Sequence, residues 1–513
     1  MKFSKSYTLL LLVFNIGILA AQNKNQKPNI IFLLTDDQTS ISVGCYGNNQ
    51  VQTPHMDGLA KEGVLFANHY NTTAICMASR VSILTGMYEY KTGVNFMHGD
   101  LTTDKLEKTY PVLLQNAGYF TGFAGKVGFE MTEAETDKIK DKLPLGYFDV
   151  WGGGPGQTFY QTAKNPTIAK YAKEYPHATR AYGAWAADFI KTATNQDKPF
   201  CMSISFKAPH LPFTTDKYFD YVYKGKTFTK PANYGEAFAT YLPAQAKSGR
   251  EYKDYSFWRD SEESYQKAIS KYNQLIFEVD YTIGEIRKSL KQYGADENTI
   301  IIFTSDNGYS CGAHNLGGKE LPYEEASKSP FIIYDPRAPK NEKGIKRETV
   351  TANIDIAPTI LSYAGLPIPK NMDGENLLPL IKNPAGIKRE FITLTNMWGN
   401  DEIQEMSVVS KDWKYIYWQY GSEIMKPAEE LYYVGKDRLE LYNHSKDPVY
   451  LKKLAEMRTI YDQHYDHLAK NIVHYNDYEK YIVLFDRKAN TASKKPFLTG
   501  TYDELAKKGK GNE

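Results

Sequence analysis

The segment Asn29-Ile30-Ile31-Phe32-Leu33-Leu34-Thr35-Asp36-Asp37 decides the fold. Residues 29–34 form an apolar run, which is typical of a parallel strand buried on both faces. Phe200–Phe206 and Thr299–Thr304 have the same character. Between them, residues 269–290 place apolar side chains at steps of three and four, which predicts an amphipathic helix ended by Gly294. A strand, a helix and a strand in succession indicate an α/β domain with a mainly parallel sheet between helices.

The chain changes character after about residue 365. Four prolines interrupt residues 367–384, as in a connecting region, and short alternating segments such as Trp413–Trp418 follow. These segments favour an antiparallel sheet, and Tyr450–Leu468 is an amphipathic stretch. We expect a large mixed, mainly parallel α/β domain over residues 22–385. A smaller α+β subdomain containing the antiparallel sheet is expected over residues 386–513.

The N-terminus has the pattern of a signal peptide. Lys2 and Lys5 precede the apolar run Leu9–Ala21, with small residues at its end. The run is too short to cross a bilayer comfortably, since spanning takes roughly 20 residues. We therefore expect residues 1–21 to direct export to the periplasm or the medium, with no integral membrane span left.

Composition excludes several classes of protein. The 513 residues contain 62 Lys and Arg against 60 Asp and Glu, and this balance argues against a nucleic-acid partner. Four cysteines cannot form a dense disulfide framework. Whether a disulfide forms among Cys45, Cys201 and Cys311 stays open.

Two oxygen-rich corners follow predicted strands. Asp36 and Asp37 end the first strand, and adjacent carboxylates repel each other unless a cation neutralises them. Asp306 and Asn307 follow the strand that begins at Thr299. Such a pair alone is also common in turns, but two corners at strand ends point to one ligand site, because open α/β sheets bind ligands there. Carboxylate and amide oxygens suit Ca²⁺ or Mg²⁺.

A third element is Cys76-Met77-Ala78-Ser79-Arg80, followed by Leu84-Thr85-Gly86. A lone cysteine is more often an inert buried residue than a nucleophile. Here, however, Cys76 precedes an apparent short helix, whose first N–H groups and dipole favour an anion. Arg80, one turn later, adds a permanent charge suited to oxyanions.

Cys76-x-Ala78-x-Arg80 with Leu-Thr-Gly resembles the signature of type I sulfatases, in the alkaline-phosphatase superfamily, and in particular bacterial exported polysaccharide sulfatases. The usual third residue is Pro rather than Ala78. Other blocks resemble the family in the expected order: Pro28–Asp37, Thr53–Gly63 with His55 where Asn is common, Asp306–Gly308, Gly318–Lys319 with Tyr323–Glu325, and Leu441–Tyr442 with Asp447–Pro448.

The resemblance implies a formylglycine, which a maturation enzyme makes from Cys76. Its hydrated aldehyde supplies one hydroxyl that attacks sulfur and a second that later expels sulfate. The resemblance also implies one Ca²⁺ held by Asp36, Asp37, Asp306, Asn307 and residue 76.

By the same resemblance, further basic residues complete the site. Arg80 orients the diol, Lys126 and Lys319 grip sulfate, and His210 donates a proton to the leaving oxygen. Many family members carry a His two or three residues after the first of these lysines, where this chain has Val127, Gly128 and Phe129. The base for sulfate elimination is therefore undetermined, and the candidates are His314, His98 and His177, which we also consider as substrate-binding residues.

The sequence thus predicts an exported sulfatase that acts on a sulfated polysaccharide or oligosaccharide. One alternative is a phosphodiesterase or phosphonate monoester hydrolase of the same superfamily. Another is a catalytically dead homologue that binds sulfated glycans, which the missing His would explain.

Overall fold

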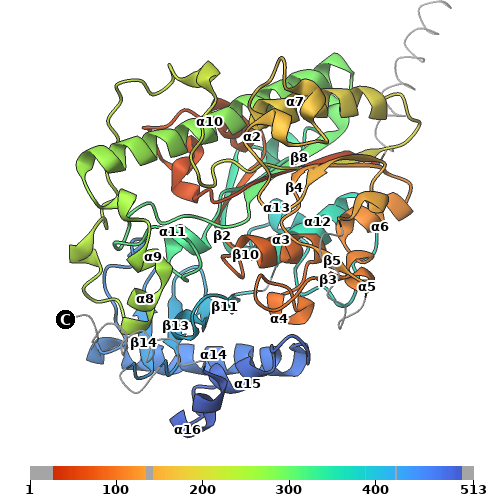
Figure 1. Cartoon of the computed structure of the whole chain (residues 1–513). Coiled ribbons are helices and arrows are strands. Elements are labelled where there is room, and N and C mark those ends of the chain that lie inside the picture. The colour runs from red at the N-terminus through yellow and green to blue at the C-terminus, as the bar shows by residue number, and fades with distance from the viewer. Residues whose placement is uncertain (1–26, 134–142, 388, 422–424, 499–513) are drawn as a thin grey trace, which may run out of the picture.

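An eight-stranded sheet runs through the N-terminal part of the molecule (Figure 1). The computed structural model describes residues 27–133, 143–387, 389–421 and 425–498. Every neighbouring pair of strands is parallel except those that involve β9. In spatial order the strands are β10 (Ile345–Ala352), β2 (Val64–Tyr70), β9 (Phe331–Tyr334), β8 (Thr299–Ser305), β1 (Asn29–Thr35), β7 (Phe200–Ser205), β4 (Phe120–Lys126) and β6 (Val150–Gly154).

Strand β1 lies inside this sheet and divides two hydrophobic cores. Ile31 and Leu33 belong to one core, whereas Ile30 and Phe32 belong to the other. The alternation follows from the period of two along a strand, and it confirms the prediction of a strand buried on both faces. Because β7 and β8 pair with β1 in parallel, the carboxyl ends of all three strands meet at one edge.

Helices cover both faces of the sheet (Figure 1). One face is covered by α2 (Pro54–Glu62), α7 (Ala178–Ala193) and the long α10 (Glu262–Gln292). The α10 helix confirms the predicted amphipathic helix, and Gly294 follows it with a φ of +67°. The other face carries α3 (Cys76–Thr85), α6 (Tyr110–Asn116), α12 (Ile356–Tyr363) and α13 (Leu378–Lys382).

The C-terminal part contains the predicted antiparallel sheet. It consists of β11 (Ile392–Asn396), β12 (Glu405–Val409), β13 (Lys414–Trp418) and β14 (Ala428–Tyr432). Helix α14 (Leu451–Asn471) packs on it through Met457 and Tyr461. The fold class is therefore confirmed. The remaining short elements are α4 (Glu89–Thr92), β3 (Leu101–Thr102), α5 (Thr103–Leu106), β5 (Met131–Thr132), α8 (Ala244–Ser248), α9 (Arg250–Lys253), α11 (Glu324–Ser327), α15 (Lys480–Leu484) and α16 (Thr491–Lys494).

The structure also bears on the predicted lack of a membrane span and on the open question of a disulfide. In the described part of the chain, no helix combines the length and apolarity needed to cross a bilayer. The predicted signal peptide, residues 1–21, lies outside the described residues. All four cysteines are described, and each is unpaired, so no disulfide joins Cys45, Cys201 and Cys311 in this structure.

Candidate active site

The two predicted oxygen-rich corners meet at the carboxyl edge of the sheet. Asp36 and Asp37 follow β1, and Asp306 and Asn307 follow the neighbouring β8. The Asn307 Nδ2 donates to Asp37 Oδ1 at 2.8 Å, and the Asp37 backbone N–H donates to Asp306 Oδ1 at 3.2 Å. All four residues are at most 3% exposed. The structure thus brings together side chains that are about 270 residues apart in the sequence.

Cys76 is the first residue of α3, as predicted, and it joins this cluster. Its Sγ and one oxygen each of Asp36 and Asp306 lie within 4.8 Å of one another. The helix ends at Gly86, whose φ of +67° is the left-handed conformation that glycine adopts easily. Cys76 is 2% exposed. A helix start at this point aims free N–H groups at the site.

Arg80 lies one turn along α3 and binds two of the carboxylates. Its Nε donates to Asp306 Oδ2 at 2.8 Å, and its second terminal nitrogen lies 3.3 Å from Asp36 Oδ2. The other terminal nitrogen donates to the Lys126 carbonyl at 2.9 Å and to the Ser205 hydroxyl. Arg80 therefore holds together the ends of β1, β4, β7 and β8.

Two lysines pair with the carboxylates of Asp36 and Asp37. The Nζ of Lys126, the last residue of β4, lies 2.5 Å from Asp36 Oδ2. The Nζ of Lys319 lies 2.5 Å from Asp37 Oδ1. Burial alone would raise the pKa of Asp36, but the charges of Lys126 and Arg80 hold it well below its usual value. By contrast, burial and the charge of Asp36 raise the pKa of Asp306 to about 7.

His210 follows β7 and faces the same cluster. Its Nδ1 lies 2.6 Å from the Leu211 carbonyl, which can only accept, so Nδ1 carries a proton. The Nε2 atom lies 3.7 Å from Asp37 Oδ2. Burial lowers the pKa of His210 to about 4. The ring is thus neutral at pH 7, with Nε2 turned toward the site.

The donor set fits a hard divalent cation. Asp36 Oδ1 and Asn307 Oδ1 are buried and have no hydrogen-bond partner among the described residues. Buried oxygens are normally satisfied, so two orphans within one carboxylate cluster indicate a missing positive partner. Three carboxylates and one amide offer the oxygen ligands that Ca²⁺ prefers. The residues that would hold it are Asp36, Asp37, Asp306 and Asn307, beside residue 76.

The other three histidines that the sequence analysis named as candidates have partners outside this cluster. His98 contacts the Asn476 carbonyl at 2.7 Å and the Tyr481 hydroxyl at 2.8 Å. His177 contacts the Thr214 carbonyl at 2.8 Å, with Glu278 at 3.3 Å. His314 lies between the Tyr241 hydroxyl and the Asn233 amide, at 2.7 and 2.9 Å.

The motifs did not single out two residues of this site. Ser205 ends β7 and accepts a hydrogen bond from Arg80. Lys207 follows two residues later, is 7% exposed, and donates to the Gln157 carbonyl at 3.0 Å. The available signal was their position at the end of β7 and in the loop after it, which carries His210.

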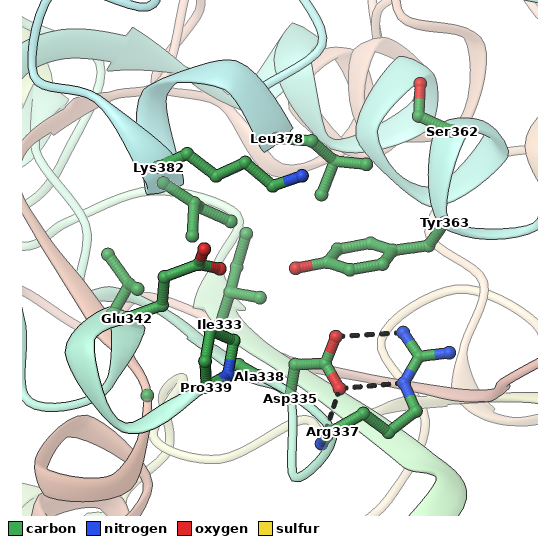
Figure 2. Close-up of a pocket in the computed structure, with 13 residues that line it drawn as sticks. Ile333, Asp335, Arg337, Ala338, Pro339, Glu342, Ser362, Tyr363, Leu378 and Lys382 are labelled. Atoms are coloured by element: carbon green, nitrogen blue, oxygen red, sulfur yellow. Dashed lines mark hydrogen bonds and ion pairs between the residues drawn. The ribbon is translucent and has the colours of Figure 1, made fainter. Parts of the chain in front are cut away.

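A separate pocket of about 410 Å³ lies at the opposite, amino edge of the sheet (Figure 2). It is lined by the start of β2, the end of β9 and the helices α12 and α13. Arg337 pairs with Asp335 on one wall, and the Tyr363 hydroxyl and Glu342 carboxylate point toward each other across the pocket (Figure 2). None of its lining residues belongs to the cluster around Cys76.

Known proteins are similar to this chain over most of its length. The family profile described as Sulfatase matches residues 28–366, and one described as N-sulphoglucosamine sulphohydrolase, C-terminal, matches residues 312–478. N-acetylglucosamine-6-O-sulfatase of Bacteroides thetaiotaomicron is 28% identical over 443 residues, which cover 74% of this chain and 76% of that protein. An ulvan-active sulfatase of Formosa agariphila is 27% identical and covers 88% of this chain and 86% of its own.

Solved structures have the same fold. One, a complex with its substrate D-glucosamine-2-N,6-O-disulfate, is 26% identical with a TM-score of 0.70. The match covers 88% of this chain and 100% of that one. The family profile covers well over half of the chain and includes Asp36, Cys76, Lys126, His210 and Asp306. This chain belongs to the sulfatase family of hydrolases, in the alkaline-phosphatase superfamily.

Proposed function

We propose that the protein hydrolyses a sulfate ester of a sulfated carbohydrate, with residue 76 as its nucleophile. One observation carries this proposal. Cys76, Asp36 and Asp306 converge within 4.8 Å, and two buried cations, Arg80 and Lys126, contact these carboxylates. A third buried cation, Lys319, contacts the adjacent Asp37. A metal-binding nucleophile inside a ring of positive charge suits a doubly charged transferring group.

Asp36, Asp37, Asp306 and Asn307 would hold calcium next to residue 76. A bound calcium ion lowers the pKa of a nearby hydroxyl and neutralises sulfate charge. Its binding would also free two lysines from the carboxylates that they contact. Lys126 and Lys319 now each pair with a carboxylate at 2.5 Å. With those carboxylates on the metal, both ammonium groups would turn to the sulfate oxygens.

Cys76 would act after conversion to formylglycine by a maturation enzyme. The hydrated aldehyde supplies the attacking hydroxyl, since a thiol lacks the second hydroxyl that later releases sulfate. Arg80 fixes the geometry around it through Asp36 and Asp306. His210 presents Nε2, and the negative charge of a bound sulfate would favour a proton on that atom. That proton is placed for transfer to the leaving oxygen.

Aromatic side chains beside the site support a sugar as the leaving group. Phe96 is 48% exposed, and its ring lies 6.3 Å from that of Trp398. Arg250 stacks on Trp398 at 4.4 Å and hydrogen-bonds to Glu320, the neighbour of Lys319. Exposed aromatic faces and a guanidinium can contact sugar rings and hydroxyls. Relatives named for N-acetylglucosamine 6-sulfate and for ulvan support the same class of substrate.

The test compares substrates on enzyme whose formylglycine content has been measured by peptide mass spectrometry. We expect kcat/KM to be higher for an aryl sulfate than for an aryl phosphodiester, and desulfation of some members of a sulfated-oligosaccharide panel. A preference for the phosphodiester would instead favour a phosphodiesterase or phosphonate monoester hydrolase. Binding of the panel without release of sulfate would favour a catalytically dead glycan-binding protein.

A further inference from the structure

Four buried cations lie at the carboxyl edge of the sheet, and one differs from the others. Arg80, Lys126 and Lys319 each contact a carboxylate of the site at 2.5–2.8 Å. Lys207 is also buried, at 7% exposure, but its described polar partner is a neutral group, the Gln157 carbonyl at 3.0 Å. Among the described residues no carboxylate pairs with it. A buried ammonium without a counter-ion is costly, so a site that keeps one has a use for its charge.

The Lys207 side chain crosses the end of β4. Lys207 follows β7, Gln157 follows β6, and β4 lies between these strands with all three parallel. The hydrogen bond from Lys207 to Gln157 therefore spans the carboxyl end of β4, where Lys126 is the last residue. The Tyr160 ring, 5.5 Å from the ammonium, supports it from the side.

The chain just after β4 cannot fill this place with a side chain of its own. Gly128 has a φ of +79°, and a Cβ there would lie 2.6 Å from Cδ of Arg80. A side chain at position 128 would displace the guanidinium that holds the cluster together. This explains why residue 128 is glycine, in the segment where the family resemblance leads us to expect His in many members. A polar group at the end of β4 must then come from the neighbouring strand β7, which Lys207 follows.

The charges that act on Lys207 are those of the active site. Burial and the charge of Lys126 lower the pKa of Lys207, Asp36, Asp37 and Cys76 raise it, and the net result is a pKa of about 8. Its ammonium therefore lies within electrostatic range of the nucleophile.

We propose that Lys207 is a further catalytic residue whose ammonium binds an oxygen of the sulfate ester that is cleaved. This inference rests on the proposed sulfatase function. Lys207 would stay on the Gln157 carbonyl in the free enzyme and contact the sulfate when substrate enters. Its charge is available for this because no carboxylate of the described residues neutralises it.

The experiment uses the converted, calcium-loaded enzyme and the variants Lys207→Met, Lys207→Gln and Lys207→Arg. A hydrogen bond to a charged group is worth roughly 1.5–3 kcal/mol. We therefore expect Met or Gln to lower kcat/KM for 4-nitrophenyl sulfate by about tenfold or more. The inhibition constant of inorganic sulfate should rise by a similar factor, whereas Arg should retain most of both. Lys224→Met, on an exposed lysine, is the matched control.

A binding measurement separates this inference from the proposed function. In a Cys76→Ala background, calorimetry with glucosamine 6-sulfate should show about tenfold weaker binding after Lys207→Gln. Lys207→Gln keeps a donor for the Gln157 carbonyl, so it serves if the Met variant does not fold.

Two results would contradict the role of Lys207, and a third would contradict the proposed function. Unchanged sulfate inhibition and unchanged kcat/KM for the aryl sulfate in a folded neutral variant would overturn the role of Lys207. A loss confined to oligosaccharides, with the aryl sulfate unaffected, also overturns it, because Lys207 would then contact another group of the glycan. Wild-type enzyme that cleaves no sulfate ester contradicts the proposed function instead.

Discussion

Two buried charge clusters of this molecule are alike in burial and different in construction. The catalytic cluster lies at the ends of strands, in the loops after them and at the start of α3, and it is the set Asp36, Asp37, Cys76, Arg80, Lys126, Asp306 and Asn307. The interface cluster is the set Glu324, Glu440, Lys328 and Lys414. In it, the Lys414 Nζ in β13 lies 2.8 Å from both Glu324 and Glu440 and so joins the C-terminal sheet to α11.

The difference lies in how the charges are satisfied. In the interface cluster, two lysines stand against two glutamates, and Lys328 lies 2.9 Å from Glu324. Oε1 of Glu440 has no hydrogen bond, but Lys414 pairs with it at 2.8 Å. The catalytic cluster leaves oxygens of Asp36 and Asn307 without hydrogen bonds, the Lys319 Nζ lies 3.9 Å from that Asp36 oxygen, and the cluster includes a potential nucleophile, Cys76. Burial of charge alone therefore does not identify a site. Unsatisfied oxygens beside a reactive group do, and the two clusters should respond differently to mutation.

Cys76→Ala should have the largest effect on activity. The change removes the nucleophile and no charged contact, so turnover should fall by at least about 10³-fold. The melting temperature should stay close to that of the wild type, since one small buried side chain replaces another. Initial rates with aryl sulfate and a thermal melt test both points. Near-wild-type turnover would refute the assignment of residue 76.

Removal of divalent metal should abolish turnover, and calcium should restore it. The ion that we propose also stabilises the folded state by mass action, by about 2.7 kcal/mol at a hundred times its Kd. Thermal melts over a calcium titration should therefore show a melting temperature that rises with calcium. In the Asp306→Asn variant this rise should be smaller. An enzyme that keeps its full rate after verified metal removal contradicts the metal site.

Lys414→Met should destabilise the protein and leave the chemistry intact. It leaves Glu324 and Glu440 buried with one cation fewer, and breaking a buried pair costs about 3–5 kcal/mol. The melting temperature should fall clearly, while kcat of the folded fraction at low temperature stays within about twofold. A variant that melts like the wild type but loses kcat would reverse the comparison between the two clusters.

Trp398→Ala should change substrate preference rather than chemistry. We expect kcat/KM to fall by about tenfold for a sulfated oligosaccharide, since a buried aromatic contact with a sugar is lost. The rate with an aryl sulfate should stay within about twofold. Tyr442→Ala, on a ring that is 67% exposed, serves as the control. Equal losses on both substrates would argue against a sugar-binding role.

The smallest effect concerns Glu89, a buried acid away from the catalytic cluster. Burial raises its pKa to about 7, whereas a glutamate in the unfolded chain titrates near 4.3. Its contribution to stability is therefore complete below about pH 4 and is lost as the pH rises to about 7. Glu89→Gln should flatten the fall in melting temperature between pH 5 and pH 8. An unchanged pH profile would contradict the shifted pKa.

The sequence predicted the parts of the site that lie next to regular structure. Asp36 and Asp306 directly follow apolar runs, and parallel strands bring their carboxyl ends to one edge, so their meeting could be inferred. Cys76 and Arg80 were one helical turn apart. Their roles, however, came from family resemblance and not from spacing.

The rest depended on three-dimensional packing. Lys207 reaches over a neighbouring strand to Gln157, a contact between segments 50 residues apart that no local pattern reveals. His98, His177 and His314 could not be placed by spacing, and each lies in a hydrogen-bond network of its own. The reason for glycine at position 128 required the position of the Arg80 side chain.

On the proposed function, the burial of Cys76 would set a time limit on its conversion to formylglycine. Cys76 is 2% exposed at the head of α3, which packs against α12, so a second enzyme would not reach its sulfur in the folded protein. Modification and folding would therefore compete for the same nascent chain. A molecule that folded first would keep its thiol, and the active fraction of a preparation would report which of the two processes was faster.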